Sequence, residues 1–327
     1  MNIRRPKMFE DASVGRVNKL ILHVLIFFAV FLVISLAQSI VPSIVTSVEM
    51  VKAMSAYTME EISSFTYEQT MEISMAIAGL PSVMLASLYA TVISTILTVI
   101  FCRFIEKRPL SSIGMVKKNC VRDYLVGMLV GLVMFSAVIG VNLLFGAMTF
   151  DGLNSSVNVG MLLLYFGGYF FQGMSEEFLC RGYLMNSIGG KHHMAWAVGI
   201  SSVVFGLLHS FNNGISVLAM VNLILVGLFL AVYMICFDNI WGACAIHSVW
   251  NFVQGNIYGV SVSGMPLSET LFFTSNTDTG ALMNGGSFGA EGGLGCTIVM
   301  VLSLAALVGY MVATGRITFG KKPVETT

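Results

Sequence analysis

The stretch LILHVLIFFAVFLVISLAQSIVPSIVT, residues 20–46, is an almost unbroken apolar run near the start of the chain. About 20 helical residues cross the hydrocarbon core of a bilayer, which is about 30 Å thick, so this run is long enough to span a membrane. It is also longer than the apolar core of a signal peptide, which has about 7–15 residues. The run therefore predicts a retained membrane anchor rather than a cleaved signal.

Seven further apolar runs of similar length follow along the chain. They lie at 79–102, 123–149, 159–180, 194–211, 215–237, 239–258 and 294–315. The 327 residues are 56% hydrophobic and 10% charged, with a mean hydropathy of +0.84, and a surface of that composition would aggregate in water. The sequence predicts an all-α, polytopic transmembrane helix bundle of about eight spans, located in the cell membrane as a multi-pass protein.

The basic residues indicate how the bundle is oriented. Sixteen of the 17 Lys and Arg residues lie at 4–19, 103–122, 181–191 and 316–322, and Lys52 is the exception. If these clusters are cytoplasmic, as the positive-inside rule requires, both termini are cytoplasmic and the number of spans is even. The formal net charge of zero excludes a polybasic nucleic-acid binder. The apolar composition makes the lipid bilayer the first partner that we expect.

The spans and charges divide the chain into five parts. Residues 1–19 are a cytoplasmic segment, and 20–158 are a transmembrane region of three spans with an acidic external loop at 48–78, which we expect to be solvated rather than an interfacial helix. Residues 159–258 form a core of four spans. Residues 259–293 are an external loop rich in Gly, Ser and Asn, which predicts a flexible linker, and 294–327 are the last span and a cytoplasmic tail. Either external loop is a candidate contact for a membrane partner.

A GxxxG pattern at Gly127 and Gly131 predicts a close helix contact in the third span. The six cysteines are dispersed, without a CxxC pair. They therefore predict packing residues rather than a disulfide framework or a thiolate zinc site.

Ionisable side chains inside spans are costly, so each one is a candidate functional residue. The candidates, together with one polar companion, are Glu176, Glu177, Arg181, His209, His247 and Asn251. Glu177 and Arg181 are four residues apart, so they share a helix face and can pair. Glu176 is rotated by about 100° and faces elsewhere, which suits a general base. The alternative is a structural ion-pair cluster.

The other candidates lie on two later spans. His209 ends the sequence FGLLH, where it is either a catalytic group or a hydrogen-bonded helix contact. His247 and Asn251 share a helix face and could donate hydrogen bonds to an oxyanion, or they could form a polar clamp between helices.

Two chemistries fit this set of residues. In the first, Glu176 activates a water molecule without any cofactor. In the second, Glu176, His209 and His247 hold a divalent metal such as zinc, with a fourth position open. The HExxH signature of many zinc proteases is absent from the sequence.

The depths of these residues pose a problem. At about 1.5 Å per residue, Glu176 lies about 7–8 Å from Arg181, whereas His209 lies about 27 Å from Lys191 if one straight helix joins them. The two side chains would then miss each other. A turn within 189–193, or a tilted or broken helix, would bring them together.

The ordered motifs EExxxR, FxxxH and HxxxN, over about 160–257, resemble those of the CPBP (Abi) intramembrane proteases. That family includes the type II CAAX prenyl endopeptidases and bacteriocin-processing or self-immunity proteins. The resemblance implies an endopeptidase, a hydrolase acting near the cytoplasmic membrane face on a membrane-associated peptide or protein. It implies that Glu176 is the base, that His209 assists it, and that His247 and Asn251 form the oxyanion hole. Both metal-dependent and metal-free mechanisms are attributed to the family.

Two rivals to this interpretation belong to other classes. One is a non-catalytic immunity or scaffold protein that binds a peptide in the same cavity. The other is a transporter with a proton relay, although the sequence shows no internal repeat of the kind that transporters often have. Intact Glu176 and Asn251 favour the enzyme over a degenerate binder, because a pure binder needs no base. The motifs do not select among a prenylated carboxyl terminus, a bacteriocin leader and another membrane peptide as substrate.

Overall fold

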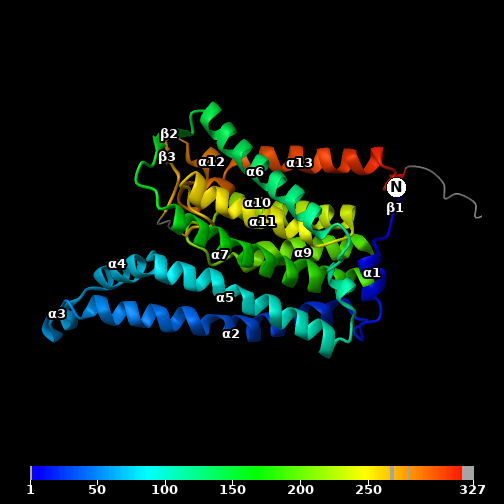
Figure 1. Ribbon diagram of the computed structural model, residues 1–327, viewed down its shortest axis with the longest axis horizontal. Coiled ribbons are helices and arrows are strands. Elements are labelled where there is room, and N and C mark those ends of the chain that lie inside the picture. Colours follow the sequence, from blue (N-terminus) through cyan, green and yellow to red (C-terminus); the bar gives the residue numbers. More distant parts are fainter. Residues whose placement is uncertain (1, 266–268, 279, 319–327) are drawn as a thin grey trace, which may run out of the picture.

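The computed structural model describes residues 2–265, 269–278 and 280–318, and it is a bundle of mostly long helices (Figure 1). Within these residues, five helical stretches are long and apolar enough to cross a membrane. They are α2 (Leu20–Met54), α5 (Pro81–Ile100) with the π-helical turn η1 (Phe101–Ile105), α6 (Cys120–Leu144), α10 (Val217–Phe237) and α13 (Leu294–Ala313). Large apolar side chains cover their outer surfaces, such as Leu32 and Leu36 on α2, which are 60% and 62% exposed. Such a surface fits lipid, and the chain is a multi-pass membrane protein.

The other three predicted spans coincide with shorter or less regular helices. They are α7 (Val159–Glu177), which continues through the π-helical η3 (Phe178–Met185) into α8 (Asn186–Lys191); α9 (Met194–Leu208); and α11 (Trp241–Phe252), which continues as η4 (Val253–Ile257). The six candidate polar residues lie on these three helices or directly at their ends. The helices that depart most from an ordinary span are therefore those that carry the candidate chemistry.

Both ends of the described chain lie at the same end of the bundle. Strand β1 (Asn2–Ile3) pairs antiparallel with β4 (Ile317–Thr318), beside the N-terminal label in Figure 1. Helix α1 (Lys7–Ala12) follows β1 and buries Met8 and Phe9. The carboxylate of Asp238, at the end of α10, accepts hydrogen bonds from the backbone N–H groups of Lys7 and Met8. These contacts satisfy two free donors at the start of α1 and fix the N-terminal segment on the bundle.

The connector after α5 packs against α1 and η3. It contains the short 3₁₀ helix η2 (Leu110–Ile113) and the fully buried Arg108. Arg108 pairs with Glu106 at 3.1 Å and donates a hydrogen bond to the Gly182 carbonyl in η3. Burial raises the pKa of the Glu106 carboxyl, and the Arg108 guanidinium opposes this shift.

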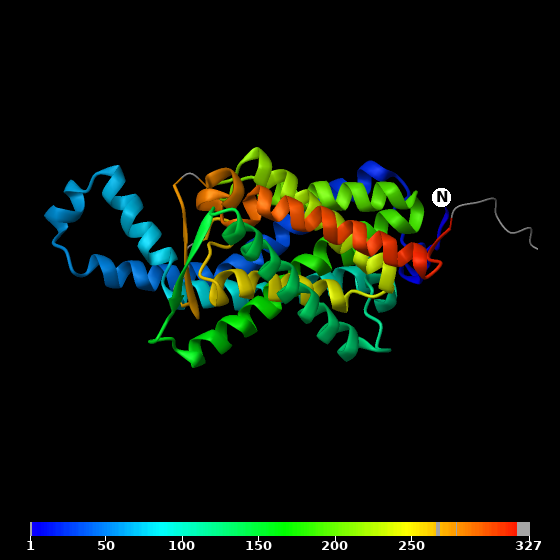
Figure 2. The ribbon, with the colours of Figure 1, turned by 90° about the horizontal axis from the view of Figure 1, so that it is seen from above.

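The acidic segment 48–78 is helical, so the expectation of a loop is corrected, although most of its side chains are exposed. Helix α2 continues to Met54, and α3 (Met59–Ser64) and α4 (Tyr67–Ala78) follow. Thr58 and Thr66 each begin a helix with a complete capping box, closed by Glu61 and Gln69 respectively. Such reciprocal caps stabilise short helices that bury little surface. The resulting hairpin projects from the end of the bundle opposite the termini (Figures 1 and 2).

The segment 259–293 is also folded rather than a flexible linker. Strand β3 (Phe272–Asn276) pairs antiparallel with β2 (Met148–Leu153), and α12 (Ala281–Asn284), η5 (Gly286–Phe288) and η6 (Ala290–Gly292) follow. Its glycines serve close packing. A Cβ at Gly264 (φ +80) would lie 2.0 Å from the Asn213 carbonyl oxygen, and one at Gly289 (φ +107) would lie 2.0 Å from that of Ser261. Residues 266–268 and 279 of this segment lie outside the described residues.

The predicted close contact of the third span is confirmed. A Cβ at Gly127 would lie 2.5 Å from the Gly242 carbonyl oxygen, and one at Gly131 would lie 2.6 Å from that of Ile246. Helix α6 therefore packs its GxxxG face directly on α11, because glycine alone permits this backbone separation.

Candidate active site

The depth of Glu176 matches that of His209, so the mismatch expected from the sequence does not occur. The helix that carries Glu176 does not end near Arg181 but continues through η3 and α8 to Lys191, 15 residues beyond Glu176. After a turn at 192–193, α9 begins at Met194, and His209 lies 15 residues further on. Both side chains are thus about 22 Å from the same end of the bundle.

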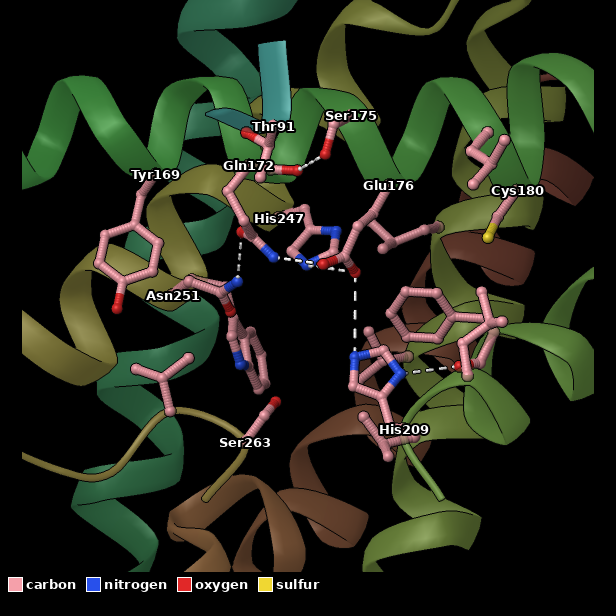
Figure 3. Close-up of a pocket in the computed structure, with 18 of the residues that line it drawn as sticks. Thr91, Tyr169, Gln172, Ser175, Glu176, Cys180, His209, His247, Asn251 and Ser263 are labelled. Carbon is pink, nitrogen blue, oxygen red and sulfur yellow. Dashed lines mark hydrogen bonds and ion pairs between the residues drawn. The ribbon is translucent and has the colours of Figure 1, made fainter. Parts of the chain in front are cut away.

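Glu176 lines a cavity of about 430 Å³ (Figure 3). Its Oε2 atom is 3.9 Å from Nε2 of His209 and 3.8 Å from Nε2 of His247. Asn251 also lines this cavity. The structure therefore brings together four of the six candidate residues, which come from three separate helices.

The hydrogen bonds of the two imidazoles determine which nitrogen of each ring faces Glu176. Nδ1 of His209 lies 2.8 Å from the Phe205 carbonyl oxygen, and Nδ1 of His247 lies 2.9 Å from Oε1 of Glu177. An oxygen acceptor at that position requires a proton on Nδ1. In a neutral ring, Nε2 then presents a lone pair toward Glu176.

Glu177 and Arg181 do not line the cavity. They form a fully buried ion pair at 2.9 Å, directly behind His247. The Arg181 guanidinium also lies over the Phe205 ring, 4.3 Å from its centroid. Because the Glu177 carboxylate contacts both Arg181 and His247, this pair orients the His247 ring from outside the cavity.

The sequence analysis missed Gln172, which links two of the motifs. Its Nε2 donates a hydrogen bond to Oε1 of Glu176, and its Oε1 accepts one from Nδ2 of Asn251 at 2.9 Å (Figure 3). Gln172 stands four residues before Glu176, one turn earlier on the same face of α7. That spacing is the signal that could have identified it.

Two further residues of the cavity wall, Ser263 and Glu291, come from the segment 259–293. Oε1 of Glu291 accepts hydrogen bonds from the Ser263 backbone N–H at 2.6 Å and from its hydroxyl at 2.7 Å. Burial raises the pKa of the Glu291 carboxyl, and the bonds from Ser263 oppose that shift. No motif or spacing in the sequence marks these residues, because the fold alone carries them to the cavity.

The donor types of Glu176, His209 and His247 suit zinc, and each imidazole donates its Nδ1 proton as metal-bound histidines commonly do. Tetrahedral zinc with ligands at about 2.0–2.1 Å places neighbouring ligand atoms about 3.4 Å apart, less than the 3.8 and 3.9 Å found here. Across the described part of the chain, no group of three or more His, Cys, Asp and Glu side chains is arranged to hold a metal ion. A metal in this cavity would supply a polarised water to the same three side chains.

The gaps around Glu176 also suit a water molecule. Atoms 3.8–3.9 Å apart are too distant for a direct hydrogen bond, but a water can lie about 2.8 Å from both. Such a water can donate one proton to the carboxylate and another to an imidazole. The arrangement can therefore hold and deprotonate a water beside a substrate carbonyl.

The family model described as type II CAAX prenyl endopeptidase Rce1-like matches residues 158–253. No curated protein and no solved structure shows significant similarity to the chain. The matched segment runs from the residue that caps α7 to the first residue of η4. It contains the six candidate residues and Gln172, but it ends before Ser263 and Glu291. The match confirms the family resemblance inferred from the three motifs.

Proposed function

We propose that this multi-pass membrane protein, whose residues 158–253 match a family of membrane proteases, is an intramembrane endopeptidase. It hydrolyses a peptide bond of a membrane-associated peptide or protein with glutamate-activated water. The observation that carries the proposal is the position of Glu176 Oε2 between the Nε2 atoms of His209 and His247.

Glu176 is the general base in this mechanism. Gln172 holds its Oε1 atom, so Oε2 points at the water site. As the water oxygen attacks the substrate carbonyl, Oε2 takes one of its protons, and Nε2 of His209 accepts a hydrogen bond from the other. This geometry keeps the nucleophile within reach of the base throughout the attack.

His247 and Asn251 stabilise the oxyanion of the tetrahedral intermediate. One N–H of the Asn251 amide donates to Gln172, which leaves its second N–H for the substrate oxygen. His247 donates from Nε2 when that atom is protonated, and the Glu177 carboxylate at Nδ1 stabilises the positive charge. Preorganised donors of this kind lower the barrier more than the same groups do in water.

The proton on Glu176 then passes to the leaving amine as the C–N bond breaks. The products are a new carboxyl terminus and a new amino terminus, and the carboxylate of Glu176 is restored. Every proton of the step is therefore accounted for by water, Glu176 and the substrate.

The proposal includes eight spans with both termini in the cytoplasm. The pairing of β1 with β4 supports an even number of crossings, and the basic clusters support the cytoplasmic side. In this orientation α7, α9 and α11 are the short or irregular spans around the cavity. Glu176 and His209 then lie about 22 Å from the cytoplasmic end of their helices, deeper than the cytoplasmic face that the family resemblance implied.

Turnover of a peptide library by the detergent-purified protein tests the proposal. We expect Glu176→Gln and His209→Ala each to lower kcat by at least about 10²-fold, as the loss of an acid–base group does. Glu60→Gln, the same change on an exposed helix, is the matched control and should cleave like wild type.

Undiminished cleavage by Glu176→Gln would contradict the assigned roles. Binding of peptides without cleavage by the wild type would instead favour the immunity or scaffold protein. A parallel series with a chelator separates metal-dependent from metal-free turnover.

A further inference from the structure

The cavity is lined by two carboxylates and two imidazoles, but its described lining has no permanently charged cation. The carboxylates are those of Glu176 and Glu291, and the described lining contains no Lys or Arg. Arg181 lies behind His247, outside the cavity, and its guanidinium is already paired with Glu177 at 2.9 Å. While both imidazoles are neutral, the carboxylates are the charged groups of this lining, and a cavity of that kind that is partly screened from water favours a cationic group.

Glu291 is a buried residue of the cavity wall, and hydrogen bonds hold both its side chain and its backbone. It is 5% exposed, and its backbone carbonyl accepts a hydrogen bond from Nδ2 of Asn222 in α10 at 2.9 Å. Its Oε1 atom holds Ser263, whereas Oε2 has no hydrogen bond to another residue in the described part of the chain. One carboxylate oxygen therefore remains available to a molecule in the cavity.

Ser263 presents its hydroxyl oxygen beside that carboxylate, on the side of the cavity opposite Gln172 (Figure 3). The hydroxyl proton is used in the bond to Glu291, so the oxygen can accept but not donate. The Ser263 backbone has φ +50, and Nδ2 of Asn212 donates to its carbonyl at 3.1 Å. Because Asn212 stands three residues after His209, the position of Ser263 is tied to that of the catalytic imidazole.

The neighbouring wall is aromatic. Tyr169 and Trp250 line the cavity with Ser263 and Glu291. Aromatic faces attract cations, and they also accommodate the methylene stem of a long basic side chain. Acceptor oxygens beside aromatic rings are the combination that binds an ammonium or guanidinium group after it loses its water.

We propose that Ser263 and Glu291 form a subsite for a basic side chain, Lys or Arg, of the substrate peptide. The inference rests on the proposed endopeptidase activity and adds a substrate class to it. The cation would stabilise the ionised form of Glu291 against the effect of burial, and each charge would reduce the cost of burying the other. The segment 259–293, which lies beyond the matched family segment, would thus select the substrate that the core cleaves.

Paired fluorogenic peptides test the subsite. Members of each pair differ at one position near the scissile bond, with Lys in one and the uncharged norleucine in the other. We expect wild type to prefer Lys at one position by at least about tenfold in kcat/KM, and Glu291→Gln to remove most of that preference. Ser263→Ala should reduce it partially, and Glu60→Gln should leave it intact.

A purely structural role of Glu291 gives a different result. Glu291→Gln would then lower cleavage of both peptides equally, or lower only the melting temperature, and either outcome overturns the subsite. An unchanged ratio of Lys to norleucine cleavage in a folded Glu291→Gln protein also overturns it.

Binding distinguishes failure of the subsite from failure of the proposed function. Fluorescence anisotropy of the same labelled peptides is measured on Glu176→Gln protein, with and without Glu291→Gln. Tighter binding of the Lys peptide that depends on Glu291 supports the subsite even if wild type cleaves nothing. Equal binding of both peptides, or no binding of either, contradicts it.

Discussion

At the scale of single residues, Gln172 links two motifs that are distant in the chain. The side chain connects Asn251, a proposed oxyanion donor, with Glu176, the proposed base. Its amide has a fixed polarity, because the N–H side faces the carboxylate and the oxygen faces Asn251. Gln172 therefore orients both partners, and in the proposed mechanism it is a positioning residue.

We expect Gln172→Ala to lower kcat by about 10- to 100-fold with a smaller effect on KM, since a misplaced base slows chemistry more than binding. Steady-state kinetics on one cleavable peptide measure both constants. Gln172→Glu retains the length of the side chain but places a second carboxylate against Glu176, so it should not restore activity. A parallel change of KM and kcat in Gln172→Ala would indicate a role in binding instead.

At the scale of elements, glycine contacts bring the helices of the site together. Gly127 and Gly131 let α6 pack on α11, which carries His247 and Asn251. On the other face of α11, a Cβ at Gly173 of α7 would lie 2.6 Å from the Ser248 backbone nitrogen. Helix α11 is thus held between two glycine faces. The distance from Glu176 Oε2 to His247 Nε2 depends on that spacing, because α7 carries Glu176 and α11 carries His247.

We expect Gly127→Ala to destabilise the protein by about 1–3 kcal/mol, because its Cβ meets backbone atoms that cannot move separately. Gly140→Ala, in the same helix with nothing within 4 Å of its Cβ, is the matched control and should be neutral or slightly stabilising. Thermal unfolding in detergent compares the two. Equal stability of the two variants would show that α6 and α11 do not pack as described.

At the scale of the whole molecule, the two ends of the described chain and the acidic hairpin lie at opposite ends of the bundle (Figure 2). Strands β1 and β4 join residues 2–3 to residues 317–318 at one end, and α3 and α4 extend the other end. Together with the distribution of basic residues, this separation predicts that β1 and β4 lie on the cytoplasmic side of the membrane and the hairpin on the external side.

We expect a membrane-impermeant maleimide to label Ser64→Cys on intact cells, and to label Ser13→Cys only after the membrane is opened. Both positions are exposed, and they lie on the acidic hairpin and at the end of α1. Five of the six native cysteines are buried, so the parent protein provides a low background. Labelling of Ser13→Cys on intact cells would contradict the cytoplasmic placement of the N-terminus.

The sequence by itself determined the features that depend on local pattern. Apolar runs predicted the helices, and the cost of burying charge identified Glu176, His209 and His247, with Asn251 on the same helix face as His247. Hydropathy and the helical repeat are properties of neighbouring residues, so the sequence alone reveals them. It also identified the GxxxG face of α6, although not its partner helix. The spacing of Thr58 and Glu61, and of Thr66 and Gln69, is also the sequence pattern of a capping box, but the composition of that segment suggested a loop.

Only the tertiary structure decided which of these residues meet. Glu176 reaches His209 because its helix continues through η3 and α8, so that two helices of matched length return to one depth. Ser263 and Glu291 enter the cavity because glycines at positive φ let the segment 259–293 pack on the bundle. Such contacts join residues that are distant along the chain, and their distances depend on the packing of whole helices rather than on any local repeat.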